Sequence, residues 1–362
     1  MFAGGGTGGH LYPAIAIADE IKRLDPHAEI LFVGTKRKIE ARVVPQKGYQ
    51  FRTIWISGFQ RKIRFGTVVF PLKVIVSMFQ ARSIIKKFNP DVVVGTGGYV
   101  SGPVLRTASM MGVPTLIQEQ NSFPGATTRL LAKKVNEVHL TFESSKQYFS
   151  DLKNVLVSGN PTRSDLENTL RVDACRYFGF GPDDNSKTLL IFGGSLGART
   201  INRAVEKNFD DLLQHNLRII WQTGAEDYAQ AKAATKKYSP AQVWVNTYID
   251  RMEYAYAVSD LIVCRAGATT IAELTVLGKP ALLVPYPFAA ANHQAENARA
   301  MVQAGAAEIV SDDEIANQLV PKISLMLDDA YLKKLSIESK KLGKPDAARE
   351  IARCVLNLAR NK

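Results

Sequence analysis

The chain has 362 residues, enough for two domains that each bury a core, and its apolar share of 46% and charged share of 22% are those of an ordinary globular protein. Its three cysteines follow no metal-binding spacing, and their odd number argues against a secreted disulfide framework and for a reducing compartment. Lys and Arg exceed Asp and Glu by 46 to 34, a formal net charge of +12, so nucleic acids, acidic lipids and phosphorylated substrates are all conceivable partners. Neither a signal peptide nor a run of about 18 apolar residues occurs, and we expect neither export nor a membrane span.

Short, continuously apolar runs alternate with helical patterns along the chain. They lie at residues 29–33, 91–95, 115–118, 189–192, 218–221, 261–264 and 281–284. This alternation predicts an α/β fold of βαβ units, with doubly wound parallel sheets that helices cover on both faces. Only Met1, Phe2 and Ala3 precede the first glycine-rich turn, fewer than the about 5 residues of an average strand, which puts the stability of a first strand in doubt.

The arrangement occurs twice, because one glycine-rich turn opens the first half at residues 4–9 and another opens the second half at 193–197. Residues 158–163 form a turn-rich connection without periodicity. We therefore expect an N-terminal Rossmann-like domain over 1–160, a C-terminal one over 161–340, and a helix over 341–362 that packs back toward the N-terminal domain. Two such domains facing across a cleft would enclose a shared ligand site.

The first glycine-rich turn, residues 4–10, reads GGGTGGH and precedes a helical pattern over 14–24. Glycines permit positive φ and close backbone approach, so the N–H groups at the helix start can cradle a phosphate or a sugar hydroxyl. His10 occupies the place where a Walker-type loop would carry Lys-Ser/Thr, and an imidazole can accept a proton near neutral pH. A purely structural turn remains the alternative for a single loop of this kind.

Two further glycine-rich segments follow apolar runs. Residues 95–103 read GTGGYVSGP, and residues 193–199 read GGSLGAR, with a hydroxyl and a cation beside the glycines. Three such loops at matched positions favour anion binding more strongly than one loop does.

Two polar segments of the second half suit a nucleotide sugar. RAGATTIAE at 265–273 places Glu273 early in a helix whose N-terminus would face phosphate, so its carboxylate could hold ribose hydroxyls. Asn292, His293 and Gln294 follow another strand end and could reach sugar hydroxyls. Taken alone, each segment could equally be a favourable helix start.

Eight motifs, in this order, resemble those of the MurG family of bacterial GT-B glycosyltransferases. They are GGGTGGHLYPA, GTGGYVSGP, IQEQNSFPG, GNPTR, FGGSLGAR, YID at 248–250, CRAGATTIAEL and NHQAENA, and the resemblance runs from about residue 3 to 310. The resemblance implies an inverting hexosyltransferase that moves N-acetylglucosamine from UDP-N-acetylglucosamine to the C4 hydroxyl of undecaprenyl-diphosphoryl-MurNAc-pentapeptide, lipid I. The product would be lipid II, for peptidoglycan biosynthesis and hence cell shape and division.

The resemblance also implies roles for single residues. Those expected to bind UDP-N-acetylglucosamine are Thr7, Gly8, Gly9, Asn121, Arg163, Ser195, Asn202, Ile249, Arg265, Ala268, Thr269, Thr270, Glu273 and Gln294. Ser195 would contact phosphate, the backbone of Ile249 would pair with uracil, and Glu273 would bind ribose. The expected catalytic residues are His10, Glu119 and Tyr99, with His10 acting as general base or only orienting substrate. Gly97, Gly98 and Ser101 are expected at the acceptor diphosphate.

We expect no metal or other cofactor, because no DxD-type carboxylate pair is apparent and helix N-termini near Ser195 and Thr269, with Arg163, could stabilise the leaving diphosphate. An apolar stretch with a basic rim includes Lys62, Arg64, Phe65, Phe70 and Lys73. It is either a core helix or a surface that docks on anionic lipid, and the basic rim favours docking. The resemblance agrees and implies a cytoplasmic enzyme, peripheral on the inner face of the bacterial membrane, with other cell-wall synthesis proteins as conceivable partners.

Other functions compete with this one. A related GT-B enzyme could glycosylate diacylglycerol or another lipid, and a GT-B-like UDP-sugar epimerase would need no membrane acceptor. A nucleotide-sugar-binding subunit without activity would be expected to lack His10 and Glu273, which are both present. No aromatic-rich basic strand or recognition motif supports binding to nucleic acid.

Overall fold

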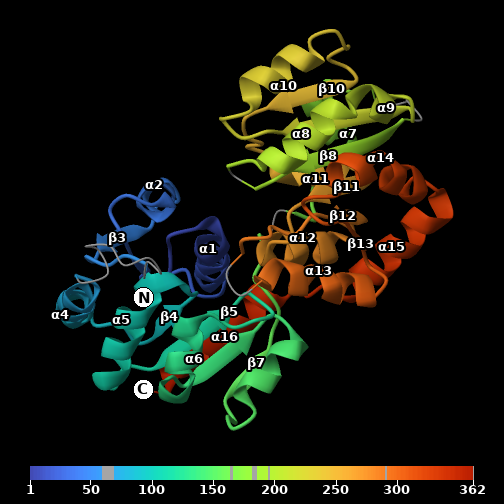
Figure 1. The fold of residues 1–362 in the computed structure, drawn as a ribbon. Helices are drawn as coiled ribbons and strands as arrows, with labels where there is room; N and C mark the ends of the chain where they lie inside the picture. The colour runs from blue at the N-terminus through green and yellow to red at the C-terminus, as the bar shows by residue number, and fades with distance from the viewer. Residues whose placement is uncertain (59–68, 164–165, 182–185, 195, 290–291, 362) are drawn as a thin grey trace. The chain divides into compact units, whose positions relative to one another are not determined.

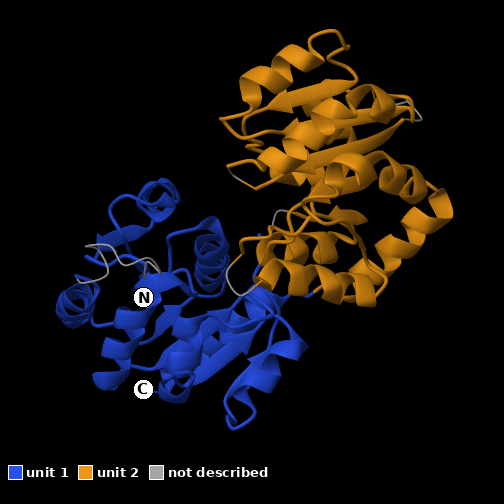
Figure 2. Ribbon diagram, in the orientation of Figure 1, with its two compact units in different colours: residues 1–163, 344–362 blue, residues 164–343 orange. Residues whose placement is uncertain are grey.

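The computed structural model in Figure 1 describes residues 1–362 except 59–68, 164–165, 182–185, 195, 290–291 and 362. The chain divides into two compact units, Met1–Arg163 with Lys344–Lys362, and Ser164–Gly343 (Figure 2). The last segment of the chain therefore belongs to the unit in which the chain begins.

The sheet of the first unit is parallel and has the strand order β3-β2-β1-β4-β5-β6-β7. Its strands are β1 (Phe2–Ala3), β2 (Leu31–Gly34), β3 (Gln50–Thr53), β4 (Val93–Gly95), β5 (Thr115–Glu119), β6 (Glu137–Leu140) and β7 (Val155–Val157). Although β1 has two residues, it lies inside the sheet, where Phe2 pairs with both Phe32 and Val94. Pairing on both sides and full burial compensate for the short length.

The helical segments of the first unit cover both faces of this sheet. They are α1 (Gly8–Leu24), α2 (Ile39–Gln46), α4 (Phe70–Phe88), α5 (Gly98–Met110), α6 (Ala126–Leu131), α16 (Ala347–Arg360) and the 3₁₀ segments η1 (Ala132–Lys134) and η2 (Glu143–Phe149). Leu11 of α1 and Ile351 of α16 share one apolar core with Phe32. Ile85 of α4 and Leu105 of α5 share the core of the opposite face. The terminal helix α16 is thus a structural part of the first unit.

The second unit repeats the plan, with a parallel sheet in the order β10-β9-β8-β11-β12-β13. Its strands are β8 (Lys187–Phe192), β9 (Leu217–Gln222), β10 (Val243–Asn246), β11 (Leu261–Cys264), β12 (Ala281–Leu283) and β13 (Glu308–Ile309). Every residue of β9 and β11 is buried, as expected for central strands covered on both faces.

The helices of the second unit flank this sheet. They are α7 (Arg171–Phe178), α8 (Arg199–Lys207), α9 (Phe209–Leu213), α10 (Tyr228–Thr235), α11 (Met252–Val258), α12 (Ala268–Leu277), α13 (His293–Gln303), α14 (Ile315–Met326) and α15 (Asp329–Lys341). The expected α/β class with two Rossmann-like parallel sheets is confirmed. Among the described helices, none is long and apolar enough to cross a bilayer.

The strand orders locate where ligands should bind. In each sheet the chain reverses its direction of growth at the first strand, between β1 and β4 in one unit and between β8 and β11 in the other. A crevice opens beyond the carboxyl ends of the strands at such a switch point. The glycine-containing segments 4–9, 96–98, 193–197 and 265–267 directly follow these four strands. The sequence motifs therefore occupy the ligand-binding positions of both folds.

Candidate functional site

His10, near the start of α1, is held by its Nδ1 atom. This atom lies 3.0 Å from the backbone oxygen of Thr96 and 2.9 Å from Oε1 of Gln120. Because a carbonyl oxygen can only accept, Nδ1 carries the proton of the neutral ring and Nε2 keeps its lone pair. In the described part of the chain no residue forms a hydrogen bond with Nε2. The half-buried imidazole is thus oriented with its basic nitrogen available to a substrate.

The loop after β4 makes this orientation rigid. Nε2 of Gln120 donates to the oxygen of Thr96 at 2.8 Å, and the hydroxyl of Thr96 donates to the oxygen of His10 at 2.7 Å. Gly97 has φ 96°, and a Cβ atom there would lie 2.8 Å from Nδ1 of His10. Only glycine therefore permits both the turn and the imidazole contact. Sequence reasoning missed Gln120, although it stands beside Glu119 in the third motif.

Two helix N-termini meet beside His10, because α1 follows β1 and α5 follows the neighbouring strand β4. A Cβ atom on Gly98 would lie 2.6 Å from the oxygen of Gly5, so the two glycine loops touch. Thr7 and Gly9 are exposed and Gly8 is half-buried. Unpaired N–H groups and the positive ends of two helix dipoles suit a diphosphate.

Ser101 lies behind this loop. Its buried hydroxyl is 2.6 Å from the oxygen of Ala3 and 2.7 Å from that of Gly97, and it accepts from the N–H of Gly97 at 3.1 Å. These bonds fasten β1 to the start of α5. The position suits a residue that shapes the loop, whereas Gly97 and Gly98 themselves border the helix start.

Glu119, at the end of β5, fixes the loop that presents Asn121. One carboxylate oxygen accepts from the N–H and the side-chain amide of Asn121 at 3.1 and 3.2 Å, and the other accepts from Gly125 and Thr128 at 2.9 and 2.5 Å. Because both oxygens are occupied, Glu119 is suited to positioning Asn121 rather than to taking a proton from substrate.

Tyr99, in the first turn of α5, lies against the first glycine loop, since a Cβ atom on Gly6 would be 3.1 Å from its ring. Burial raises the pKa of the Tyr99 phenol above its ordinary value. The phenol stays protonated and can donate a hydrogen bond, which does not suit a general base.

Glu40, which sequence reasoning did not single out, supports the same loop. Its buried carboxylate accepts from the N–H of Gly6 at 2.9 Å and from the N–H and hydroxyl of Thr35 at 3.1 and 2.8 Å. It lies in α2, outside every motif. Only the fold brings it to the glycine loop.

In the second unit, α12 begins at the switch point with Ala268, Thr269 and Thr270 in its first turn. The hydroxyl of Thr269 is buried and has no hydrogen-bond partner among the described residues. A buried polar atom usually has a partner, so a hydroxyl without one at a helix N-terminus indicates a missing acceptor. A phosphate would supply it.

Glu273 lies one turn further along α12 and is buried. The hydroxyl of the buried Tyr256 donates to its Oε2 atom at 2.8 Å. Tyr256 carries no motif signature and was missed from the sequence. It fixes one carboxylate oxygen of the residue expected to bind ribose.

Gln222, at the end of β9, joins two expected parts of the nucleotide site. Its Nε2 donates to the oxygen of Gly194 at 2.8 Å, and its Oε1 accepts from the N–H of Ile249 at 2.9 Å. The N–H of Ile249 is therefore occupied in this state. Pairing of that N–H with a base would require the bond to Gln222 to open.

Asn202 and Arg265 are engaged inside the second unit. Asn202 donates to the oxygen of Thr223 at 2.7 Å and accepts from the indole of Trp221 at 3.0 Å. Arg265 donates to the oxygens of Val284 and Pro285 at 3.2 and 3.3 Å and pairs with Asp312. Both residues suit a supporting role.

Gln294, near the start of α13, uses Oε1 to accept from the N–H of Tyr286 at 2.9 Å, which leaves its NH₂ group as a donor. Arg163 ends the first segment of the first unit. Four other expected residues, Ser195, Lys62, Arg64 and Phe65, lie outside the described residues.

The remaining residues of the expected membrane surface lie on α4. Phe70 begins this helix and packs against the core of the first unit. Lys73 donates to the hydroxyl of Ser57 at 3.0 Å and lies 5.7 Å from the ring of Trp55.

Comparison with known proteins agrees with this geometry. The profile of the glycosyltransferase family 28 N-terminal domain matches residues 1–140, and that of its C-terminal domain matches residues 188–351. A relative from Christiangramia forsetii is 44% identical over 100% of this chain and 98% of its own length, and one from Prosthecochloris aestuarii is 46% identical over 100% and 99%. Both are named UDP-N-acetylglucosamine–N-acetylmuramyl-(pentapeptide) pyrophosphoryl-undecaprenol N-acetylglucosamine transferase.

Solved structures agree as well. The crystal structure of MurG from Acinetobacter baumannii is 27% identical, with a TM-score of 0.75 over 99% of this chain and 98% of that one. A UDP-GlcNAc 2-epimerase from Neisseria meningitidis is 15% identical, with a TM-score of 0.67 over 98% of each chain, a likeness of fold alone. The GT-B fold expected from the motifs is confirmed, and the epimerase alternative is not favoured. On matching domain profiles and full-length relatives, the chain belongs to glycosyltransferase family 28.

Proposed function

We propose that the chain transfers N-acetylglucosamine from UDP-N-acetylglucosamine to the C4 hydroxyl of the muramoyl sugar of lipid I, with inversion, to give lipid II for peptidoglycan synthesis. The assignment of the two substrates rests on sequence identity, because two relatives named for this reaction are 44% and 46% identical to the chain over its full length. We assign the acceptor to the first unit and the UDP-sugar chiefly to the second.

The C4 hydroxyl of the acceptor needs a general base to take its proton, and the geometry of His10 supports that role. With Nδ1–H held by Thr96 and Gln120, the Nε2 lone pair can take the proton of the C4 hydroxyl as that oxygen attacks C1 of the donor sugar. The N-termini of α1 and α5, with Gly97 and Gly98, would hold the acceptor diphosphate beside it. Tyr99 would donate a hydrogen bond, and Glu119 would position Asn121.

The departing UDP needs stabilisation of its diphosphate, and the N-terminus of α12 supports that role. The N–H groups of its first turn and the hydroxyl of Thr269, which has no partner among the described residues, can donate to phosphate oxygens as charge develops. Glu273, held by Tyr256, would accept from ribose hydroxyls. Ser195, Arg163 and Gln294 remain proposed donor contacts, and we propose that catalysis needs no metal.

One assay tests the substrates. Purified protein receives labelled UDP-N-acetylglucosamine with lipid I, with diacylglycerol or with no acceptor. We expect label to move only to lipid I. Transfer to diacylglycerol would identify another lipid glycosyltransferase, and conversion of the UDP-sugar to its C2 epimer without acceptor would identify an epimerase.

We also propose that the enzyme is cytoplasmic and docks peripherally on the anionic inner face of the membrane through α4. Leu72, Ile75 and Phe79 lie on one face of this helix and are 54%, 53% and 70% exposed. Exposed basic residues continue along the helix, at Arg82, Lys86 and Lys87. Each such residue near an anionic surface contributes about 1 kcal/mol, in addition to the burial of the apolar face.

Vesicle binding tests this surface. We expect binding to anionic vesicles that weakens with salt and is lost when Lys62, Arg64 and Lys73 are changed to Glu. A triple Glu variant at Lys232, Lys236 and Lys237 of the second unit is the control for net charge. Binding of UDP should persist in both variants. Equal vesicle binding by the triple variant at Lys62, Arg64 and Lys73 and by the parent at low salt would refute docking through this surface.

A further inference from the structure

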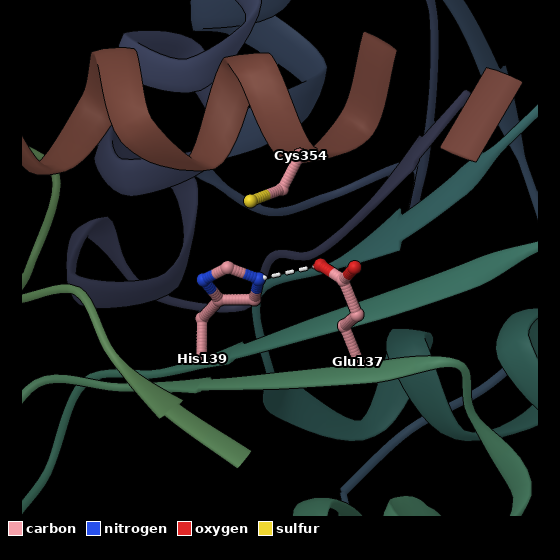
Figure 3. Close-up of side chains that lie close together, drawn as sticks. All are labelled: Glu137, His139 and Cys354. Carbon is pink, nitrogen blue, oxygen red and sulfur yellow. Dashed lines mark hydrogen bonds and ion pairs between the residues drawn. The ribbon is translucent and has the colours of Figure 1, made fainter. Parts of the chain in front are cut away.

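Three side chains of metal-binding type converge between β6 and α16, away from the loops described above (Figure 3). Glu137 and His139 lie two residues apart on β6 and so face the same side of the sheet. Cys354 reaches them from α16, more than two hundred positions later in the chain. Their nearest ligand atoms all lie within 4.8 Å of one another. Figure 3 shows the carboxylate of Glu137 beside the imidazole of His139, and the thiol of Cys354 above the ring on the side of the helix.

The imidazole of His139 is fully buried and fixed at both nitrogens. Nδ1 lies 2.7 Å from the hydroxyl of Ser158, and Nε2 lies 2.9 Å from Oε2 of Glu137. A hydroxyl can donate or accept, so Ser158 accommodates either neutral tautomer. Without a metal, Nε2–H donates to Glu137, because a carboxylate only accepts, and Nδ1 accepts from the hydroxyl of Ser158. In the other tautomer Nδ1–H would donate to Ser158, and the Nε2 lone pair would point into the cluster. This is the arrangement of a metal-bound histidine, whose other nitrogen is oriented by a neighbouring hydrogen bond.

We propose that Glu137, His139 and Cys354 form a zinc site that fastens α16 to β6. Imidazole, thiolate and carboxylate are the zinc ligands of proteins, and thiolate disfavours Mg²⁺ and Ca²⁺. Zinc bonds of about 2.0–2.3 Å place tetrahedral ligand atoms about 3.3–3.8 Å apart. Nε2 of His139 and Oε2 of Glu137, which lie 2.9 Å apart, would separate slightly on binding zinc, and the remaining ligand distances, all within 4.8 Å, need only small shifts. Water can complete the fourth position, because the side chain of Glu137 is 26% exposed. Coordination releases the thiol proton to solvent.

The site is structural and separate from the proposed reaction. Glu137 is the first residue of β6, whereas His10 and Asn121 lie beyond the carboxyl ends of their strands. The helix α16 joins the unit from the far end of the chain and completes the core around Phe32 and Leu116. A metal bound to one residue of α16 and two of β6 therefore secures a segment that closes the fold of the first unit.

The test uses the full chain without an affinity tag, stripped with EDTA, desalted and supplied with one equivalent of Zn²⁺ under reducing conditions. We expect one tightly bound zinc per chain and a higher unfolding temperature. Co²⁺ in place of Zn²⁺ should give the near-ultraviolet absorption of a cobalt–thiolate bond. Cys354→Ser should abolish that absorption, and Cys354→Ser and Glu137→Gln should each weaken zinc binding about 10- to 100-fold or more.

Two features of the design keep the outcome clear. Glu137→Gln retains an oxygen that can accept from His139, so the fold should persist without the charged ligand. Glu350→Gln, an exposed change one turn earlier on α16, is the matched control and should bind zinc as the parent does. Absence of tight zinc in the parent, or equal zinc binding by the parent and both ligand variants, would overturn the proposal. So would zinc bound without a cobalt–thiolate absorption. None of these results depends on glycosyl transfer.

Discussion

The substitution Thr269→Val probes the proposed phosphate site, because it should change stability and ligand binding in opposite directions. Valine has nearly the shape of threonine but no hydroxyl. In the ligand-free chain this hydroxyl is buried without a partner among the described residues, so its removal breaks no hydrogen bond there. With UDP bound, the same hydroxyl would donate to a charged oxygen.

The expected changes in stability and in UDP affinity follow from the ligand-free and UDP-bound states of this hydroxyl. A buried polar group without a partner costs about 1–3 kcal/mol, so the variant should be as stable as the parent or more stable by up to about that amount. A hydrogen bond to a charged group contributes about 1.5–3 kcal/mol, so the dissociation constant of UDP should rise about 10- to 150-fold.

Calorimetric titration with UDP and urea unfolding of the ligand-free protein measure both quantities. Thr275→Val is the matched control, since the hydroxyl of Thr275 on the same helix donates to the oxygen of Ala272 at 3.0 Å. The control should lose some stability and keep its affinity for UDP. Unchanged UDP affinity in Thr269→Val, or a fall in stability that matches the fall in affinity, would refute a phosphate contact at this hydroxyl.

Three further predictions concern the donor, metals and pH. Glu273→Ala should raise the KM for UDP-N-acetylglucosamine strongly, since ribose loses a charged acceptor contributing about 1.5–3 kcal/mol, and an unchanged donor KM in initial-rate assays would contradict this. EDTA should leave turnover of lipid I largely intact because helix N-termini stabilise the diphosphate, whereas full inactivation reversed by Mg²⁺ would show that a metal is needed. Burial lowers the pKa of Lys279 to about 8, below its ordinary 10.5, so the unfolded chain binds more protons between these values. The free energy of unfolding should therefore rise from pH 8 to pH 10, and in Lys279→Met that rise should be smaller in urea titrations.

The sequence predicts the central strands better than the edges of the sheets. Residues 189–192 and 261–264 are continuously apolar because helices cover both faces, and they lie within β8 and β11. The edge strands β3 and β10 are partly exposed and carry polar residues, so their pattern does not stand out. The strand β1 has too few residues for any pattern and forms because β2 and β4 pair with it.

The residues of the candidate site also fall into two groups, those that a sequence motif reveals and those that only the fold brings together. Glycine loops can be found in a sequence because their backbone geometry demands a particular residue. The hydrogen bonds of Gln120, Gln222 and Tyr256 join residues that are between 17 and 110 positions apart in the sequence, so no local sequence pattern predicts them. Motif membership also cannot separate a residue that touches a ligand from one that holds the loop. Ser101 lies in the motif GTGGYVSGP and Asn202 follows the motif FGGSLGAR by three residues, yet their polar atoms bond within the fold.

The central claim is that this chain glycosylates lipid I with Nε2 of His10 as the base. The most direct measurement compares His10→Ala with the parent, using kcat for lipid I at saturating UDP-N-acetylglucosamine across pH together with the dissociation constant of UDP. We predict that kcat falls about 100-fold or more, that the acidic limb of the pH profile disappears, and that UDP binds nearly as tightly as before. A kcat near that of the parent, or a loss of UDP affinity as large as the loss of rate, would contradict the claim.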